Sequence, residues 1–203
     1  MNNLVDFFAI AEKLECEYRT TRMSDGAQQS VASHSWNMII MAIALQPHLT
    51  RSVNMERVME MCALHDLPEA IVHDVPLHKQ TPDVRAKKYA QESVAVSQIT
   101  DLLGNDKIRN VLDEYEERKS YEARLVKAID VLDVALQHLC AADLKYVGEY
   151  DDNFYWKLFF SDKLASGFDF EPALRGVFDE IRRRVSKRLL NELGIDSSVF
   201  VGK

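Results

Sequence analysis

Hydrophobic residues recur along most of this chain with the three-to-four-residue period of amphipathic helices, and strand-like alternation is absent. Only seven glycines and five prolines interrupt the pattern. Two polar segments break it, Arg19–Ser30 with an Asp25-Gly26 turn signal and Asp74–Thr81. We expect helices over these ranges: Val5–Tyr18, Val31–Gln46, Asn54–Asp66, Pro68–His73, Pro82–Leu103, Asp106–Arg118, Tyr121–Val147 and Glu171–Leu193. The pattern predicts an all-α protein.

The third of these helices has to end beside a histidine–aspartate pair, His65-Asp66. Adjacent residues on a helix point about 100° apart, so neighbouring side chains do not normally share one target. Pro68 disfavours helical geometry at Leu67 and would clash with the carbonyl of Leu64 if the helix continued. We therefore expect the backbone to bend just after Asp66, so that both side chains reach one point, which we interpret as a metal ion.

Three polar residues, His34, His65 and Asp130, lie on otherwise apolar helical faces. Their apolar neighbours at helical spacing are Met38, Met41 and Leu45 for His34, Met55, Val58 and Cys62 for His65, and Val126 and Val134 for Asp130. Taken singly, each is more typical of a satisfied core histidine or of a capping or ion-paired aspartate. Buried carboxylates are costly unless they are paired or bind a metal. Together with Asp66, the set of two imidazoles and two carboxylates suits divalent Mn, Fe, Co, Ni or Zn.

Composition and charge narrow the class of protein. At 203 residues, with 47% hydrophobic and 28% charged residues and no long linker, the chain suits a single domain. The net charge of −7 argues against a nucleic-acid or membrane-surface partner. Three separated cysteines without a CxxC pair fit a reducing compartment, and neither a signal peptide nor a membrane-spanning run is evident. We expect a cytoplasmic protein.

Four motifs in this order resemble the HD-domain metal-dependent phosphohydrolase superfamily, and within it the 5′-deoxynucleotidase branch. They are Ser30-Val-Ala-Ser-His34-Ser, Ala63-Leu-His65-Asp66-Leu-Pro-Glu69-Ala, Asp74-Val-Pro and Leu125-Val-Lys-Ala-Ile-Asp130. The His-Asp dipeptide alone is a weak motif, but the four-part pattern is specific. The resemblance implies one HD-type helical bundle over residues 1–203, with a core at about 5–139 and a C-terminal helical extension at about 148–195. Aromatic residues between Tyr150 and Phe160 suggest a packed cap or a dimer contact in that extension.

The resemblance also implies a function and a site. It implies hydrolysis of a small phosphate ester, a (deoxy)nucleoside 5′-monophosphate, to nucleoside and phosphate by a homodimeric enzyme. Three sets of residues carry over: metal ligands His34, His65, Asp66 and Asp130; catalytic residues Glu69 and Asp74; and substrate contacts Arg19, Asp66, Asp74 and Asp130. The metal is one divalent ion, Co, Mn, Mg, Zn, Ni or Fe. Such an ion lowers the pKa of its water and polarises a phosphoryl oxygen.

Two departures from the family pattern leave the substrate open. Thr20 follows Arg19 where the bacterial enzymes carry tryptophan, and His73 stands where glycine usually precedes Asp74. Arg22 is a second candidate for the arginine that binds the substrate phosphate. Glu69 also has a purely structural interpretation, since an acidic residue is favourable in the first turn of a helix. The alternatives are therefore a non-catalytic nucleotide-binding or regulatory HD protein and a phosphatase for another small phosphorylated metabolite.

Overall fold

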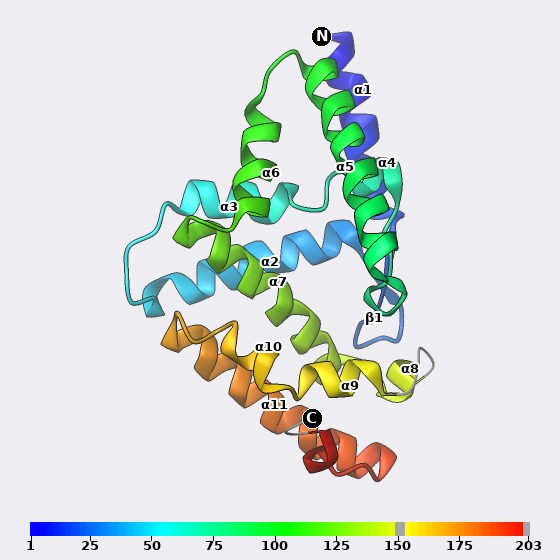
Figure 1. The fold of residues 1–203 in the computed structure, drawn as a ribbon, viewed down its shortest axis with the longest axis vertical. Coiled ribbons are helices and arrows are strands. Elements are labelled where there is room, and N and C mark those ends of the chain that lie inside the picture. The colour runs from blue at the N-terminus through cyan, green and yellow to red at the C-terminus, as the bar shows by residue number, and fades with distance from the viewer. Residues whose placement is uncertain (149–152, 201–203) are drawn as a thin grey trace. The chain divides into compact units, whose positions relative to one another are not determined.

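The computed structural model of the protein describes residues 1–148 and 153–200, and these are mainly helical (Figure 1). The α-helices are α1 Asn2–Glu12, α2 Val31–Leu45, α3 Met55–Leu64, α4 Glu69–Val72, α5 Pro82–Leu103, α6 Lys107–Glu117, α7 Tyr121–Cys140, α8 Lys145–Gly148, α9 Phe154–Phe159, α10 Asp162–Ser166 and α11 Pro172–Leu193. Four short 3-10 segments accompany them in the described ranges: η1 Lys13–Glu15, η2 Gln46–His48, η3 Leu77–Lys79 and η4 Ser197–Phe200. The all-α prediction is confirmed.

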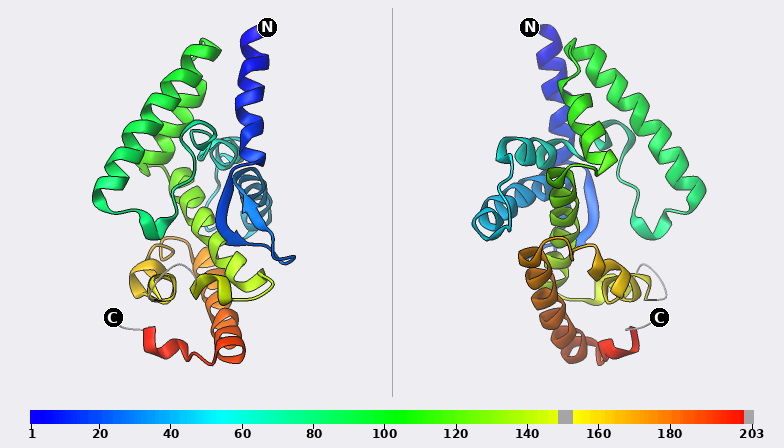
Figure 2. Two further views of the ribbon diagram at one scale, coloured as in Figure 1. Left: turned by 90° about the vertical axis from the view of Figure 1, so that its right-hand side faces the viewer. Right: turned by 60° about the vertical axis from the view of Figure 1, so that its left-hand side comes forward.

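The polar segment after the first helix contains a β-hairpin, which the sequence pattern did not predict. Strands β1 (Tyr18–Arg22) and β2 (Gln28–Ser30) pair with each other, and both arrows are visible in the left view of Figure 2. Strands of five and three residues are too short for alternation to stand out in a sequence. The predicted turn is present, since Gly26 has a φ of 85° and Asp25 accepts a hydrogen bond from the amide of Ala27. The hairpin matters because β1 carries Arg19.

Two helices of the described residues end more than five residues before the predicted position. The first ends at Glu12 and continues only as the 3-10 segment η1, because the chain then enters β1. Helix α7 ends at Cys140 instead of Val147. Carbonyl oxygens at this end bond to a distant side chain, since Arg188 donates from Nη1 to that of Leu139 in α7 over 2.7 Å and to that of Ala141 just beyond it over 3.0 Å. Long-range bonds of this kind satisfy the groups that a helix end leaves open and terminate the helix.

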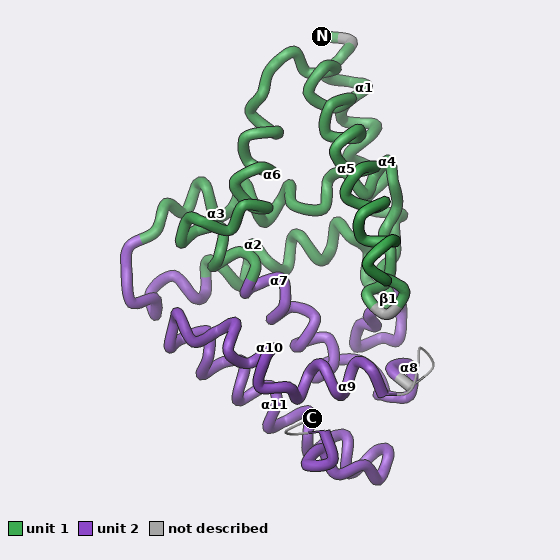
Figure 3. Tube along the Cα trace, viewed as in Figure 1, with its two compact units in different colours: residues 1–20, 29–43, 53–127 green, residues 21–28, 44–52, 128–203 purple. Residues whose placement is uncertain are grey.

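The described residues form two compact units (Figure 3). Unit 1 comprises residues 1–20, 29–43 and 53–127, and unit 2 comprises residues 21–28, 44–52 and 128–203. Helix α7 starts in unit 1 and ends in unit 2. The single HD-type domain expected from the sequence stays a prediction.

The core of unit 1 supports the turn between α3 and α4. Helix α1 packs against α4 and α5, and α6 packs against α3 and α5 (Figures 1 and 2). The buried side chains of this core come from all parts of the unit: Leu14, Val31, Leu67, Ala70, Val96, Ile99, Ile108 and Leu112. Because Leu67 and Ala70 belong to it, burial of apolar area fixes the backbone on both sides of Glu69.

Unit 2 has a core of aromatic rings. The ring of Phe168 stacks on that of Phe178 with centroids 4.3 Å apart, and Phe159 meets Phe160 edge to face. Trp156 is also buried there. These contacts make the aromatic segment of the predicted extension a packed layer, although Tyr150 lies outside the described residues. Among those residues, no helix combines the length and the apolar character needed to cross a membrane.

Candidate metal centre and active site

The backbone breaks where the sequence predicts. Helix α3 starts after Asn54, whose side chain accepts a hydrogen bond from the amide of Arg57, and it ends at Leu64. Residues 65–68 form turns, and α4 begins at Glu69 with Pro68 as its N-cap. Proline lacks an N–H, so Pro68 cannot donate to the carbonyl of Leu64 and α3 does not continue through it. The bend places the side chains of His65 and Asp66 at the end of α3.

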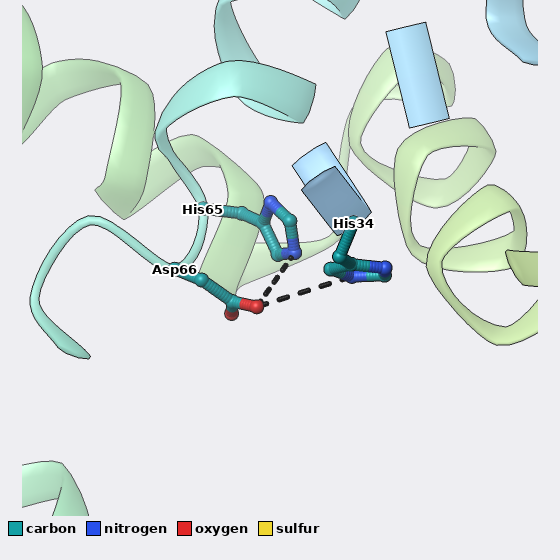
Figure 4. Close-up of side chains that lie close together, drawn as sticks. All are labelled: His34, His65 and Asp66. Atoms are coloured by element: carbon teal, nitrogen blue, oxygen red, sulfur yellow. Dashed lines mark ion pairs between the residues drawn. The ribbon is translucent and has the colours of Figure 1, made fainter. Parts of the chain in front are cut away.

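The structure brings together His34, His65 and Asp66 (Figure 4). Oδ2 of Asp66 lies 3.2 Å from Nε2 of His65 and 3.9 Å from Nε2 of His34. One ligand atom from each of the three residues lies within 4.8 Å of the others. Residues from α2 and from the α3–α4 turn therefore direct three donor atoms at one small volume.

A hydrogen bond orients the ring of His65. Nδ1 of His65 lies 3.1 Å from the carbonyl oxygen of Cys62. A carbonyl oxygen only accepts, so Nδ1 carries a proton, and in the neutral tautomer Nε2 has the lone pair that a metal ion takes. Metal-bound histidines commonly have this arrangement, because a second-shell acceptor orients the ring. The buried rings of His34 and His65 meet edge to face with centroids 5.3 Å apart.

The donor set fits a divalent metal ion. Two imidazole nitrogens and one carboxylate are ligands that Zn, Mn, Fe, Co and Ni accept. A carboxylate at the protein interior is also costly without a compensating cation. Burial by itself raises the pKa of Asp66, but His65, Arg19 and His34 outweigh burial and hold that pKa well below its usual range. The carboxylate is thus kept in the charged form that a metal requires.

Arg19 contacts the same carboxylate. Its Nη1 donates to Oδ2 of Asp66 over 2.9 Å, and both side chains are mostly buried. Of the two arginines that the sequence left open, Arg19 is therefore the one that the described contacts bring to this centre. Arg22 belongs to unit 2, where its Nη1 lies 3.5 Å from the carbonyl oxygen of Gly26.

Glu69 is buried beside the centre, and only 3% of its side chain is exposed. Burial, together with the charges of Asp66 and Asp74, raises the pKa of Glu69 to about 8, although Lys88 opposes that shift. Nζ of Lys88 lies 2.8 Å from Oε1 of Glu69. A carboxyl group whose pKa is near neutrality can accept and return a proton at physiological pH.

Asp74 lies at the start of the loop after α4, where Glu17 holds it. The amide of Asp74 donates to Oε1 of Glu17 over 2.9 Å, and Nδ1 of His73 lies 2.8 Å from Oε2 of the same carboxylate. Burial raises the pKa of Asp74, while Arg19 and Lys88 lower it. His73 itself has φ 67° and ψ 155°, a backbone conformation that is almost confined to glycine.

Asp130 is buried on the part of α7 that belongs to unit 2. Its roles as fourth metal ligand and substrate contact therefore stay predictions. The other predicted residues, Arg19, His34, His65, Asp66, Glu69 and Asp74, all lie in unit 1.

Sequence reasoning missed Lys88 and Glu17. Lys88 follows Glu69 by 19 residues and reaches it from α5, and Glu17 reaches Asp74 across 57 residues. The single signal in the sequence was the spacing of Lys88 and Glu92 at i and i+4, and many solvated helix faces share that spacing. Only the packing of α5 and of η1 on α4 reveals these contacts.

Known proteins similar to this chain include curated relatives with a named activity. The protein named 5′-deoxynucleotidase HDDC2 of Danio rerio is 34% identical over 142 residues, which cover 68% of this chain and 68% of the relative. The protein of the same name from Dictyostelium discoideum is 30% identical over 147 residues, covering 68% of this chain and 76% of the relative.

Solved structures share the fold. A crystal structure described as a predicted metal-dependent phosphohydrolase from Magnetospirillum magnetotacticum MS-1 superposes with a TM-score of 0.73 at 23% identity, covering 92% of this chain and 93% of the other. A conserved hypothetical protein from Pyrococcus furiosus gives a TM-score of 0.62 at 25% identity and covers 88% and 99%. A family model described as HD domain matches residues 11–162. The match includes His34, His65 and Asp66, whose donor atoms converge in the structure. The chain therefore belongs to the HD-domain family.

Proposed function

We propose that this protein is a divalent-metal-dependent phosphomonoesterase that hydrolyses (deoxy)nucleoside 5′-monophosphates to nucleoside and phosphate. The observation that carries the proposal is the convergence of His34, His65 and Asp66 within 4.8 Å, directly beside Arg19. The activity named for the relatives from Danio rerio and Dictyostelium discoideum supports the substrate class.

His34, His65, Asp66 and Asp130 would hold one divalent ion, Co, Mn, Mg, Zn, Ni or Fe. When bound, such an ion supplies Lewis acidity towards a phosphoryl oxygen and towards the attacking water. The protein keeps its own part of the centre ready, because the Cys62 carbonyl orients the ring of His65 through Nδ1 and Arg19 pairs with Asp66.

The remaining residues act on phosphate and water. Arg19 offers a planar fork of N–H donors that matches phosphate oxygens, and its contact with Asp66 orients that fork. Glu69 takes a proton from the attacking water at its carboxylate. Asp74, together with Asp66 and Asp130, contacts the substrate, and the Glu17 carboxylate fixes the backbone at Asp74.

We also propose that the protein works as a cytoplasmic homodimer, as its composition and the family resemblance predict. Light scattering coupled to size-exclusion chromatography tests the homodimer and should return twice the 23.3 kDa of one chain. A mass of one chain at micromolar concentration contradicts the homodimer.

A phosphate-release assay tests the activity. The purified protein is analysed for bound metal and assayed on a panel of nucleoside and deoxynucleoside 5′-monophosphates with Mn, Co, Mg or Zn. Asp66→Asn should abolish release and reduce bound metal. Asp101→Asn changes an exposed aspartate on α5 and serves as the matched control. Hydrolysis that survives Asp66→Asn rules out the metal mechanism, and stoichiometric metal without release from any nucleotide favours a nucleotide-binding protein.

A further inference from the structure

Lys88 is the described cation in direct contact with Glu69. It projects from α5, its side chain is 18% exposed, and its Nζ lies 2.8 Å from Oε1 of a carboxylate that is almost fully buried. Burial alone lowers the pKa of Lys88, but Glu69 and Glu92 outweigh it and hold that pKa above its ordinary range. The ammonium group is therefore charged throughout the physiological range.

The two oxygens of Glu69 have different surroundings. Oε1 accepts the hydrogen bond from Lys88, whereas Oε2 is buried and has no hydrogen-bond partner among the described residues. A buried acceptor without a partner is costly, so proteins retain one mainly where it has a role. Lys88 thus holds Oε1 of Glu69, whereas Oε2 is left to bind a group from outside the protein, such as water.

Lys88 is itself held in place. Oε1 of Glu92, one helical turn further along α5, lies 3.4 Å from Nζ of Lys88. Helix α5 packs on α4, the short helix that begins with Glu69, and also on α1 and α6. The ammonium group therefore sits on a rigid element, and such an element positions a catalytic group better than a loop does.

We propose that Lys88 is a positioning residue, whose ammonium group holds Oε1 of Glu69 so that Oε2 alone faces the attacking water. This inference rests on the proposed phosphomonoesterase function. It explains why Glu69 stays oriented among the charges of Asp66 and Asp74, which repel its carboxylate.

Lys88→Met tests the proposal because methionine keeps most of the length of lysine and removes the charge. We expect kcat to fall about 100-fold, within the range of a lost general base, with KM changed less than about 3-fold. Lys88→Arg should recover part of kcat. Lys87→Met, at the exposed neighbouring lysine of α5, should leave both constants unchanged.

A double-mutant cycle shows whether Lys88 acts through Glu69. If it does, Lys88→Met should reduce kcat little further in a Glu69→Gln background. An equal loss in both backgrounds, or an increase in KM at unchanged kcat, overturns the proposal because Lys88 would then act on the substrate itself. Circular dichroism and metal content of each variant identify losses that arise from misfolding, and Glu92→Gln supplies a milder variant with a loss of a few-fold.

A second measurement does not depend on activity. Crystal structures of the wild type and of Lys88→Met should show the Glu69 carboxylate in different orientations, while Lys87→Met leaves it unchanged. An identical carboxylate in Lys88→Met overturns the positioning role. If the wild type releases no phosphate from any nucleotide, the proposed function fails, and the carboxylate orientation still decides the role of Lys88.

Discussion

The guanidinium of Arg19 donates from Nη1 to Oδ2 of Asp66 over 2.9 Å, although 47 residues separate the two in the chain. The contact joins strand β1 of the hairpin to the turn between α3 and α4. Because Oδ2 of Asp66 is also the oxygen nearest to His65, one carboxylate connects the candidate phosphate-binding arginine to the candidate metal ligands.

Replacing Arg19 should weaken binding of the substrate phosphate. A charged hydrogen bond contributes about 1.5–3 kcal/mol, so we expect Arg19→Ala to raise KM for a nucleoside monophosphate by about 10–100-fold. Arg19→Lys should recover little, because an ammonium group cannot form the bidentate contact. Steady-state phosphate release measures both. Arg22→Ala is the control, and a larger KM increase there would transfer the role to Arg22.

The backbone strain at His73 makes an unusual stability prediction. At an ordinary position alanine is more stabilising than glycine, by about 0.4–1 kcal/mol. At φ 67° and ψ 155° the order should reverse, and His73→Gly should exceed His73→Ala in free energy of unfolding by about 1–2 kcal/mol. Both variants lose the contact with Glu17 equally, so their difference reports the backbone alone. Urea denaturation measures it, and equal stabilities would show that residue 73 is unstrained.

His138 should make stability depend on pH. Burial lowers the pKa of His138 from 6.5 to about 4, and its ring hydrogen-bonds the hydroxyl of Tyr146. Between these pH values the unfolded chain binds a proton at residue 138 that the folded protein excludes. The contribution of His138 to the free energy of unfolding is therefore fully present above about pH 6.5 and decreases as the pH falls towards 4. At about 1.4 kcal/mol per pH unit, the loss approaches about 3 kcal/mol.

Comparison with His138→Gln isolates this contribution, because all other titrating groups are common to both proteins. The difference in unfolding free energy between wild type and variant should therefore shrink as pH falls from 6.5 to 4. Parallel curves over that interval would show that His138 titrates normally in the folded protein.

Glu171 is a fully buried carboxylate that ties residues 44–52 to the start of α11. Its Oε2 accepts from the amide and the hydroxyl of Thr50 over 3.0 and 2.7 Å, and its Oε1 accepts from the amide of Ala173. Glu171→Ala should leave these donors unsatisfied and destabilise the protein by about 3 kcal/mol in thermal or urea unfolding. Asp169→Asn, at an exposed carboxylate paired with Arg175, should cost less than about 1 kcal/mol. Similar losses in both variants would contradict the special role of Glu171.

Local signals explain what could be predicted. Helical periodicity placed His34 and His65 on apolar faces, and Pro68 indicated where α3 must end. Both signals act within a few residues, so they survive in a sequence read without its fold. The hairpin that carries Arg19 was missed because its short strands leave no periodic signal and are stabilised by pairing with each other.

The sequence by itself therefore determined the helical class, the bend at His65-Asp66 and the chemistry of the candidate metal ligands. Only the tertiary structure decided that Arg19 contacts Asp66, that Lys88 holds Oε1 of Glu69 and that Glu17 binds the backbone of Asp74. These three contacts join residues 19 to 57 positions apart. They arise from the packing of whole helices around a shared core, and no short pattern of residues encodes that packing.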